Sequence, residues 1–317
     1  MNFIFLMDPL ETVNMELDTS FILMLESHRR GHRVFFLPDG GIVFKEGQFT
    51  FHVEEILPQR AEGRPFLRQG KRVLKAEDAD AIFVRSDPPF DGQYLLNSWL
   101  LDLLPKNIFM MNFPSGIRTV NEKLWALQFK DCVPPTLVTR RKQEMLEFFH
   151  RHKEIVAKPT DGHGGQKIFH IKKSDTNANV IFEVLSENGS KEIILQKFIP
   201  ESKIGDKRIL LLDGDILGAV LRVHPPGEHR NNIFAGGEPL PAQITARDRE
   251  IVKKLKPKLR ALGLYFAGID ILGKYLTEVN VTSPTCLQEM NRLYNVSLEK
   301  KVIDFVEKNV KQYKTRK

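Results

Sequence analysis

Two carboxylates and an amide near the C-terminus have the residue types and the spacing of a cation site. Glu278 and Asn280 lie two residues apart in an apolar segment, so on a β-strand they share one face. Asp270 joins them if the turn between the two strands has three residues, Gly273 to Tyr275, because residue 270 then lies opposite residue 278. A two-residue turn would place Asp270 on the other face.

The apolar neighbours of these three residues indicate a buried sheet. Two carboxylates buried side by side repel each other and lose their hydration, which costs free energy. A hard divalent cation removes both problems, and the three side chains offer the oxygen ligands that Mg²⁺ prefers alongside substrate phosphates. Asp270, Glu278 and Asn280 therefore predict a metal site, although their spacing alone also fits the exposed polar face of a hairpin.

A lysine followed by a glycine-rich loop is the second candidate. Lys158 ends the apolar segment 155–159, and the loop 160–165 reads Thr-Asp-Gly-His-Gly-Gly. Glycines let the backbone approach a ligand closely, and successive N–H groups can cradle phosphate oxygens. The lysine favours phosphate binding over a plain hairpin turn, although the loop has neither a Walker A motif nor Gly-x-Gly-x-x-Gly. Lys123 is a weaker candidate for the same role.

Arginines form the third candidate set. Arg208 and Arg222 are expected at opposite ends of a two-strand stretch, and Arg230 lies in the long loop that follows. Guanidinium groups match carboxylates and phosphates bidentately. Each arginine alone also fits an ordinary surface position. Their place beside the predicted metal strands in the sequence favours a role in binding an anionic substrate.

The composition sets the class of protein. The chain has 317 residues, enough for two domains or three small ones, and its 42% hydrophobic and 27% charged residues argue against intrinsic disorder. No apolar run is long enough for a transmembrane helix, and the first residues lack the basic region of a signal peptide. With Cys132 and Cys286 as the only cysteines, we expect no disulfide framework and a cytoplasmic location.

The net charge of +7 fits a solvated basic surface, an anionic small ligand or nucleic acid. No basic run interleaved with aromatic residues and no helix-turn-helix signature is present, so nucleic acid is not the favoured ligand. The nine histidines show no metal-ligand spacing, and no Gly-x-Ser-x-Gly motif indicates a serine nucleophile.

The N-terminal elements predict a parallel sheet. A strand, a helix capped by Asp18, Thr19 or Ser20 and ended by Gly31, and a second strand form a βαβ beginning. The turn 85–90 follows a buried strand, at the sheet edge where ligands bind in open α/β sheets. The expected strands are 2–7, 34–37, 81–84 and 108–111, with a hairpin and a polar excursion over 40–75 and a loop at 114–116.

The rest of the chain predicts shorter strands that surround the candidate residues. The pair Thr245 and Asp248 forms a capping box for a helix that contains Pro257 and ends at Gly263, and the last ten residues are expected to be a frayed helix end. The expected helices are 121–129 and 141–152, and the expected strands are 136–138, 155–159, 168–171, 193–196, 209–212, 216–223, 265–272 and 276–281, with a long loop over 224–242.

Motifs that cover nearly the whole chain in order resemble the prokaryotic glutathione synthetases, which are ATP-grasp ligases. Asp-Pro-Pro-Phe-Asp and Asn-Val-Thr-Ser-Pro-Thr are the most specific of them. The motifs are Met-Asp-Pro (7–9), Arg-x-Asp-Pro-Pro-Phe-Asp (85–91), Asn-Glu-Lys-Leu (121–124), Lys-Pro-x-Asp-Gly-x-Gly-Gly (158–165), Gly-Asp-Lys-Arg (205–208), Gly-Glu-x-Arg-x-Asn (227–232), Ala-Gly-Gly (235–237), Gly-x-Asp-Ile-x-Gly (268–273) and Thr-Glu-x-Asn-Val-Thr-Ser-Pro-Thr (277–285).

The resemblance implies an α/β fold of the ATP-grasp type with three parts. Residues 1–120 would form an N-terminal parallel-sheet domain that binds substrate, 121–200 a lid, and 201–317 a catalytic subdomain with an antiparallel sheet. ATP would lie between the last two. The implied reaction joins γ-glutamylcysteine to glycine through an acyl phosphate, giving glutathione, ADP and phosphate, in a homo-oligomer without nucleic-acid or membrane partners.

The resemblance also implies a role for each candidate residue. Arg222 would stabilise charge at the acyl-transfer centre, Arg208 would hold the acyl phosphate or substrate, and the loop 224–238 would close over them. Asp270, Glu278 and Asn280 would hold two Mg²⁺ ions, with Mn²⁺ as an alternative. The implied nucleotide contacts are Lys123 and Lys158 at the phosphates, Asp161, Gly162, Gly164 and Gly165 in the lid loop, and Gln196, Lys197, Phe198 and Ile199 around adenine.

Two positions depart from the family pattern. Glu238 follows Gly237 where an arginine is usual, and Ser86 stands where a lysine is common. Both changes remove positive charge near the expected substrate, so the second hypothesis is another ATP-grasp carboxylate–amine ligase with a different acceptor. Hypotheses from other classes are a non-catalytic ATP-binding regulator and, because of the positive charge, a nucleic-acid binder.

Overall fold

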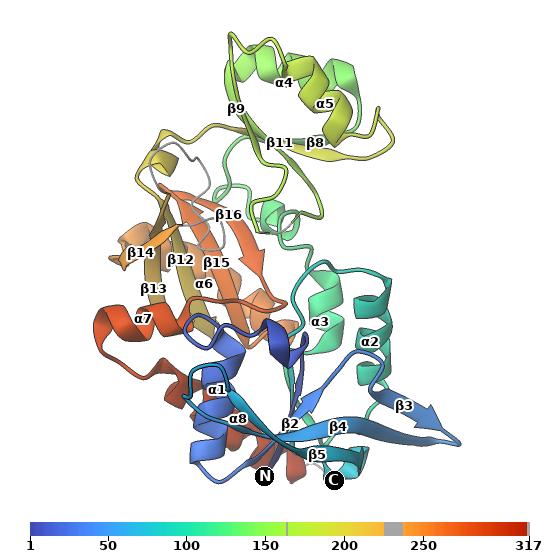
Figure 1. Ribbon diagram of the computed structural model, residues 1–317. Coiled ribbons are helices and arrows are strands. Elements are labelled where there is room, and N and C mark those ends of the chain that lie inside the picture. Colours follow the sequence, from blue (N-terminus) through green and yellow to red (C-terminus); the bar gives the residue numbers. More distant parts are fainter. Residues whose placement is uncertain (163, 225–236, 316–317) are drawn as a thin grey trace.

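The computed structural model describes residues 1–162, 164–224 and 237–315, and these contain sheets of seven, four and five strands. Figure 1 shows the seven-stranded sheet at the bottom, the five-stranded sheet in the middle and the four-stranded sheet at the top. One sheet is built on parallel strands and the other two are antiparallel, which confirms the mixed α/β fold class expected from the sequence.

The N-terminal sheet has the order β3-β4-β2-β1-β6-β7, and β5 pairs with β4. Its central strands β2, β1, β6 and β7 are parallel, as the βαβ pattern predicts. The expected hairpin and polar excursion are the antiparallel strands β3 to β5. The strands are β1 (Asn2–Leu6), β2 (Arg33–Leu37), β3 (Ile42–Lys45), β4 (Gln48–Pro58), β5 (Phe66–Lys75), β6 (Ala81–Val84) and β7 (Phe109–Met111).

Helices cover both faces of this sheet. The carboxylate of Asp18 accepts a hydrogen bond from the Phe21 N–H at 2.8 Å and begins α1, as predicted. The segment 114–116, expected to be a loop, is instead the start of α3, because Pro114 occupies the first turn, where proline suits a helix. The elements are η1 (Leu10–Thr12), α1 (Thr19–Arg29), η2 (Ala76–Asp78), α2 (Gly92–Asp102) and α3 (Pro114–Thr119).

The four-stranded sheet, of order β10-β9-β11-β8, carries two helices on one face and has a hydrophobic core of its own. That core includes Met145, Phe149 and Phe182, which come from the two helices. We call this unit the lid. Its elements are β8 (Thr136–Thr139), α4 (Lys142–His152), β9 (Glu154–Pro159), β10 (Phe169–Lys172), α5 (Ala178–Leu185) and β11 (Ile193–Lys197).

The helix expected over 121–129 is wrong, since this segment forms only the short turn η3 (Trp125–Gln128). The Asn121 side-chain oxygen accepts hydrogen bonds from the N–H groups of Lys123 and Leu124, at 3.1 and 3.0 Å. The backbone carbonyl of Glu122 accepts from the Val279 N–H at 2.8 Å. These bonds tie the segment to a distant strand, so its backbone groups are not available for a helix.

The five-stranded sheet, of order β14-β13-β12-β15-β16, is antiparallel throughout and includes the strand pair expected over 265–281. One face is covered by α6, which begins with the predicted capping box of Thr245 and Asp248. The elements are η4 (Pro200–Lys203), β12 (Asp206–Leu212), β13 (Asp215–Val223), β14 (Glu238–Pro241), α6 (Ala246–Ala261), β15 (Phe266–Leu272), β16 (Tyr275–Asn280), α7 (Leu287–Tyr294) and α8 (Leu298–Lys314).

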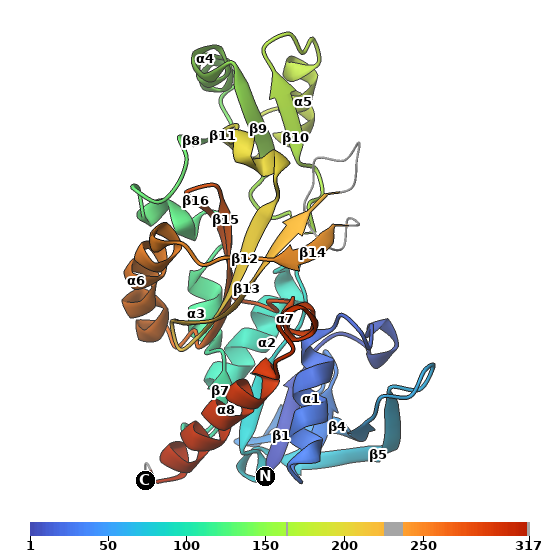
Figure 2. The same cartoon turned by 90° about the vertical axis from the view of Figure 1, so that its left-hand side faces the viewer.

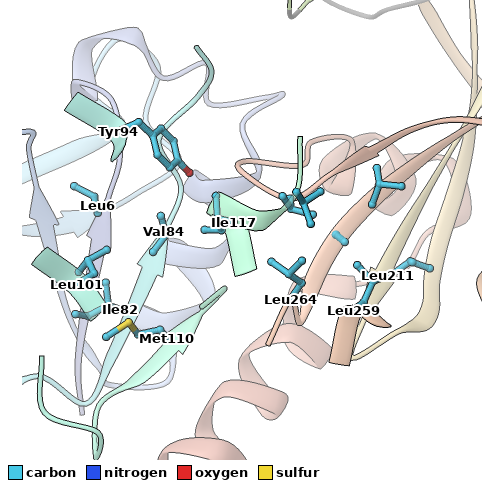
Figure 3. Close-up of a cluster of buried hydrophobic side chains, with 14 of the residues drawn as sticks. Leu6, Ile82, Val84, Tyr94, Leu101, Met110, Ile117, Leu211, Leu259 and Leu264 are labelled. Carbon is cyan, nitrogen blue, oxygen red and sulfur yellow. The ribbon is translucent and has the colours of Figure 1, made fainter. Parts of the chain in front are cut away.

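The N-terminal and five-stranded sheets share one hydrophobic core. Figure 3 shows Leu6, Ile82 and Met110 on one side of it and Leu211, Leu259 and Leu264 on the other, with Ile117 of α3 between them. Gly116 makes this contact close, because a Cβ at that position would lie 2.2 Å from the carbonyl oxygen of Leu262. The two sheets are therefore one packed body, and the lid has a separate core.

Helix α8 returns to the N-terminal sheet and packs beside α1, as Figure 2 shows. The expectation of a frayed end is wrong up to Lys314, because Val310 and Tyr313 are buried in the same hydrophobic cluster as Phe3 and Phe5 of β1. No helix in the described part of the chain is long and apolar enough to cross a membrane.

A charged cluster joins α1 to α8, and we expect it to make stability depend on pH. Glu26 accepts hydrogen bonds from Arg29 at 2.6 Å and Arg30 at 2.7 Å, and Arg30 also donates to Asp304 of α8 at 2.6 Å. The hydrogen bonds from the two arginines lower the pKa of Glu26 from 4.5 to about 2. The stabilisation is therefore complete above pH 4.5 and lost as the pH falls towards 2.

We predict that Glu26→Gln lowers the free energy of unfolding at pH 7 by about 1.5–3 kcal/mol, since it removes charge-assisted hydrogen bonds. Urea unfolding of the variant and the wild type between pH 7 and pH 3 measures the difference, which should shrink below pH 4.5. The exposed residue Lys301 offers a matched control, Lys301→Ala, which should change stability little. A difference that stays constant with pH would contradict the prediction.

Candidate active site

A pocket of about 910 Å³ lies between the lid and the five-stranded sheet, and its rim reaches Asp87 and Pro88 of the N-terminal part. It is lined by every residue proposed from the sequence as a nucleotide, metal or catalytic contact, except Asp161. Arg230 and most of the loop 224–238 lie outside the described residues. The pocket thus brings together residues that lie more than 150 positions apart in the sequence, such as Lys123 and Asn280.

The hairpin that carries the predicted metal residues differs from the expectation in its turn. Leu272 of β15 pairs with Tyr275 of β16, so the turn has two residues and the expected three-residue turn is wrong. A β-bulge compensates, because Thr277 is an extra residue in β16 and its hydroxyl donates to the Asp270 carbonyl at 3.0 Å. Asp270 therefore lies opposite Glu278, on the face that the prediction required.

Asp270 lies between the two predicted arginines. Arg208 donates to both of its carboxylate oxygens, at 2.5 and 2.8 Å, and Arg222 Nη2 lies 3.1 Å from Oδ2. Asn280 donates to the same oxygen at 3.3 Å. Burial acts to raise the pKa of Asp270, but the two guanidinium groups outweigh it and hold that pKa below its ordinary value. The carboxylate is therefore ionised and is contacted by three donor side chains while it still lines the pocket.

The sequence analysis missed Asp206, which completes this ion network. Asp206 lies opposite Arg222 in the β12–β13 pair and accepts two hydrogen bonds from its guanidinium, at 2.6 and 2.5 Å. Burial raises the pKa of Asp206, and Arg222 opposes that shift. The signal for its role was present in Gly205-Asp206-Lys207-Arg208, where alternate residues of one strand share a face. The network pairs the buried Asp270 and the partly buried Asp206 with two buried arginines.

Room for this network comes from a glycine. Gly268 of β15 lies two residues before Asp270, and a Cβ there would be 3.2 Å from Cδ of Arg208 and 3.1 Å from Cβ of Pro284. The Arg208 side chain thus crosses the sheet where no side chain stands in its way. Any residue larger than glycine at this position must displace the arginine or the proline.

Two lysines face the other carboxylate of the set. Nζ of Lys123 and Nζ of Lys158 each lie 3.8 Å from Oε1 of Glu278, although the lysines come from different segments. Lys123 also donates to the backbone carbonyl of Gly162, which ties it to the glycine loop. Burial lowers the pKa of Lys158, and the Glu278 charge opposes this effect. A cluster of this kind can hold the phosphates of a nucleotide.

The glycine loop reaches the pocket with a left-handed backbone that favours glycine. Gly164 and Gly165 have φ values of 60° and 78°, which a residue with a side chain rarely adopts. Both line the pocket together with Gly162, whereas the Asp161 side chain is exposed and contributes nothing to the lining. His163 lies outside the described residues.

The part of the pocket next to the end of β11 is partly apolar. Gln196, Lys197, Phe198 and Ile199 line it, from the end of β11 onward. The ring of His170, which the sequence analysis missed, stacks on Phe198 with 4.0 Å between centroids and 10° between planes. A purine ring, planar and uncharged, fits such a site.

Residues of the segments that follow β6 and α3 anchor the segment after β16. The Glu122 carboxylate accepts hydrogen bonds from the N–H of Val281 at 2.9 Å and from the hydroxyl of Thr282 at 3.0 Å. Buried Arg85 donates to the Pro284 carbonyl at 3.2 Å, and the Ser283 hydroxyl donates to Asp87. The two motifs that gave the most specific resemblance therefore meet in space at the pocket rim.

The two departures from the family pattern lie away from this lining. Ser86 is buried and faces a small separate cavity that Tyr94 and Asn97 also line. Glu238 is exposed at the start of β14, where it pairs with Val223. Among the described residues, neither contributes a side chain to the large pocket.

Comparisons with known proteins decide the family. A family model for the prokaryotic glutathione synthetase N-terminal domain matches residues 1–118, and one for the ATP-grasp domain of the same family matches residues 122–295. The chain belongs to the prokaryotic glutathione synthetase family. It is an ATP-dependent ligase that synthesises glutathione, which confirms the resemblance and the activity that it implied.

Similar proteins support this assignment over the full length. The glutathione synthetase of Escherichia coli (strain K12) is 37% identical over 308 residues, covering 96% of this chain and 98% of that protein. The glutathione synthetase of Synechocystis sp. is 39% identical over 318 residues, covering 97% and 99%.

Solved structures show the same fold at low identity. The D-cycloserine synthetase DcsG has a TM-score of 0.65 and 14% identity, covering 99% of this chain and 100% of its own. The ATP-grasp ligase PsnB, solved with a minimal precursor, Mg and ADP, has a TM-score of 0.62 and 15% identity, covering 98% of both chains.

We predict that Gly268→Ala lowers the kcat of glutathione synthesis by roughly tenfold, since the added Cβ displaces Arg208 by a few tenths of an ångström and misplacement by 1 Å costs about 100-fold. The control Gly92→Ala adds a Cβ with nothing within 4 Å and should keep the wild-type rate. Steady-state kinetics and thermal unfolding of both variants test this. A Gly268→Ala enzyme with wild-type kcat would show that the position of Arg208 does not matter.

Proposed function

We propose that the large pocket is where this chain joins γ-glutamylcysteine to glycine, with ATP held between the lid and the five-stranded sheet. The observation that supports this most is the meeting of Asp270, Glu278 and Asn280 with Lys123 and Lys158 in one pocket. In this proposal residues 1–120 form the substrate-binding domain, 121–200 the lid and 201–317 the catalytic subdomain.

The three oxygen-bearing side chains fit a magnesium site that is completed by the nucleotide. Among the described residues, no group of three or more His, Cys, Asp or Glu side chains could hold a metal alone. Two carboxylates and an amide on one face of a sheet match the preference of Mg²⁺ for a few protein oxygens plus substrate phosphates. We propose that Asp270, Glu278 and Asn280 hold two Mg²⁺ ions, or Mn²⁺ in their place, which neutralise phosphate charge when bound.

The first half of the proposed reaction forms an acyl phosphate. The dipeptide carboxylate attacks the γ-phosphorus of ATP, the bond to the β-phosphate oxygen breaks, and ADP leaves. Lys123 and Lys158 hold the phosphates in line for this attack, and the glycine loop, with Gly162, Gly164 and Gly165, covers them. Gln196 to Ile199 hold the adenine, so the lid positions the nucleotide at both ends.

The second half transfers the acyl group. The glycine amine attacks the acyl carbon, a tetrahedral intermediate forms, and its collapse expels phosphate and makes the peptide bond. In this proposal Arg222 stabilises the developing oxyanion and Arg208 holds the acyl phosphate, and both arginines line the pocket. No protein nucleophile is needed, because charge neutralisation and positioning supply the catalysis.

A ligase with a different acceptor is the second hypothesis. The departures at Ser86 and Glu238 suggested it, but both residues lie away from the described lining, and the similar proteins over the full length are glutathione synthetases. A non-catalytic regulator or a nucleic-acid binder gains no support from these comparisons. The homo-oligomer and the cytoplasmic location stay predictions from the sequence.

An acceptor screen tests the proposed function. Phosphate release from ATP is measured with γ-glutamylcysteine plus glycine and with other dipeptide and amino-acid pairs. We expect release only with the glutathione pair, with glutathione as the product by mass spectrometry. Release with another pair and none with this one would favour the second hypothesis.

We predict that Glu278→Gln lowers kcat by roughly 100- to 1,000-fold, the effect of removing one group that stabilises transition-state charge. The variant keeps the shape of the side chain, so thermal unfolding should show a folded protein. Glu250→Gln, a change on the exposed face of α6, is the matched control and should retain wild-type kinetics. A near-normal rate in Glu278→Gln would remove Glu278 from the proposed metal site.

A further inference from the structure

Arg208 and Arg222 share Asp270 unequally. Arg208 donates two hydrogen bonds to Asp270, through Nε at 2.5 Å and Nη2 at 2.8 Å. Arg222 instead makes its two short bonds to Asp206 and only the longer contact, 3.1 Å, to Asp270. The side chains of Arg208 and Asp270 are 7% and 6% exposed, so this pair is almost dry.

A divalent ion and Arg208 compete for the same carboxylate oxygens. Oδ2 of Asp270 accepts from Arg208 and Asn280 and also lies 3.1 Å from Arg222, while among the described residues Oδ1 accepts from Arg208 alone. An ion bound through both oxygens must displace one of these donors, and its positive charge repels the Arg208 guanidinium. A buried charge that loses its partner is strongly destabilised, because neither water nor a counter-ion replaces the lost attraction. Arg222 would keep Asp206 as its counter-ion, whereas Arg208 would need a new anion.

We propose that the Arg208–Asp270 pair is a latch that couples the two substrate sites. Binding of the metal–nucleotide complex takes Asp270 away from Arg208, and the freed guanidinium then binds the carboxylate of the peptide substrate. This inference rests on the proposed function for the metal and substrate positions. Without nucleotide, Asp270 occupies Arg208 internally and keeps the affinity for the peptide carboxylate low.

Of the two acids in the proposed metal site, only Asp270 is part of the latch, because Glu278 faces the lysines. Oε1 of Glu278 lies 3.8 Å from Nζ of Lys123 and of Lys158, and among the described residues its ion pairs are with these lysines and not with either arginine. Neutralising Glu278 should therefore weaken the metal site without freeing Arg208. Neutralising Asp270 should weaken the metal site and free Arg208 at the same time.

Isothermal titration calorimetry with γ-glutamylcysteine measures the coupling directly. In the wild type we expect the peptide to bind about 5- to 150-fold more tightly with Mg²⁺ and the non-hydrolysable nucleotide AMPPNP than without them, the usual range of coupling between two sites. AMPPNP with EDTA should not give this gain. Equal affinity in all three conditions would overturn the latch.

Two variants separate the latch from other causes of coupling. Asp270→Asn should bind the peptide more tightly than the wild type when no nucleotide is present, by a factor similar to the wild-type gain. Glu278→Gln is the matched control and should keep the wild-type affinity under this condition. A folded Asp270→Asn protein that binds the peptide no better than the wild type would overturn the proposal.

A third variant covers the case in which Asp270→Asn does not fold. Arg208→Gln removes the cation that competes for Asp270, so Mn²⁺ added without nucleotide should bind more tightly than to the wild type, as followed by electron paramagnetic resonance. Unchanged Mn²⁺ affinity would overturn the latch. The latch can fail while the wild type still makes glutathione, whereas failure of the proposed function would appear as absence of that product in the acceptor screen.

Discussion

The site depends on one buried carboxylate, Asp270, held by guanidinium groups from two neighbouring strands. Removing a carboxylate and a guanidinium group from water costs free energy. Their mutual attraction compensates for this cost only when the geometry satisfies most of their hydrogen bonds. Three local features provide that geometry: the register that places Arg208 opposite Asp270, the bulge at Thr277, and the missing side chain at Gly268. Each is a property of the backbone, so the sheet determines the charge arrangement.

One face of the five-stranded sheet packs into the hydrophobic core, and the other face carries the charged residues of the pocket. Ile209, Ile269 and Val279 belong to the core shared with the N-terminal sheet and α6. The alternate positions Arg208 and Asp270 project from the opposite face into the pocket. Because the core is continuous beneath them, the ion network stands on a rigid base, while the lid, with its separate core, supplies the other wall.

The sequence predicted the types of the site residues better than their geometry. Burying a charged side chain in an apolar strand costs free energy unless the charge is paired or binds a ligand. Lys158, Asp270 and Glu278 were therefore recognisable as site residues. The turn length was predicted wrongly, because a bulge depends on tertiary contacts that alternation along one strand does not reveal. The helix at 121–129 was wrong because its backbone partner, β16, is distant in sequence. Asp206 was missed although its alternation with Arg208 on one strand carried the signal.

The positively charged side chains of this pocket are paired with acidic side chains of the protein, so their number alone does not give the charge that a substrate meets. Lys123 and Lys158 share Glu278, while Arg208 and Arg222 share Asp270 and Asp206, so the protein alone balances much of its own charge. An anionic substrate must therefore compete with internal acids for every cation that it uses. A surface change such as Glu238 has less influence on that competition than a change to either internal acid, because screening by water weakens exposed charges and leaves buried pairs strong.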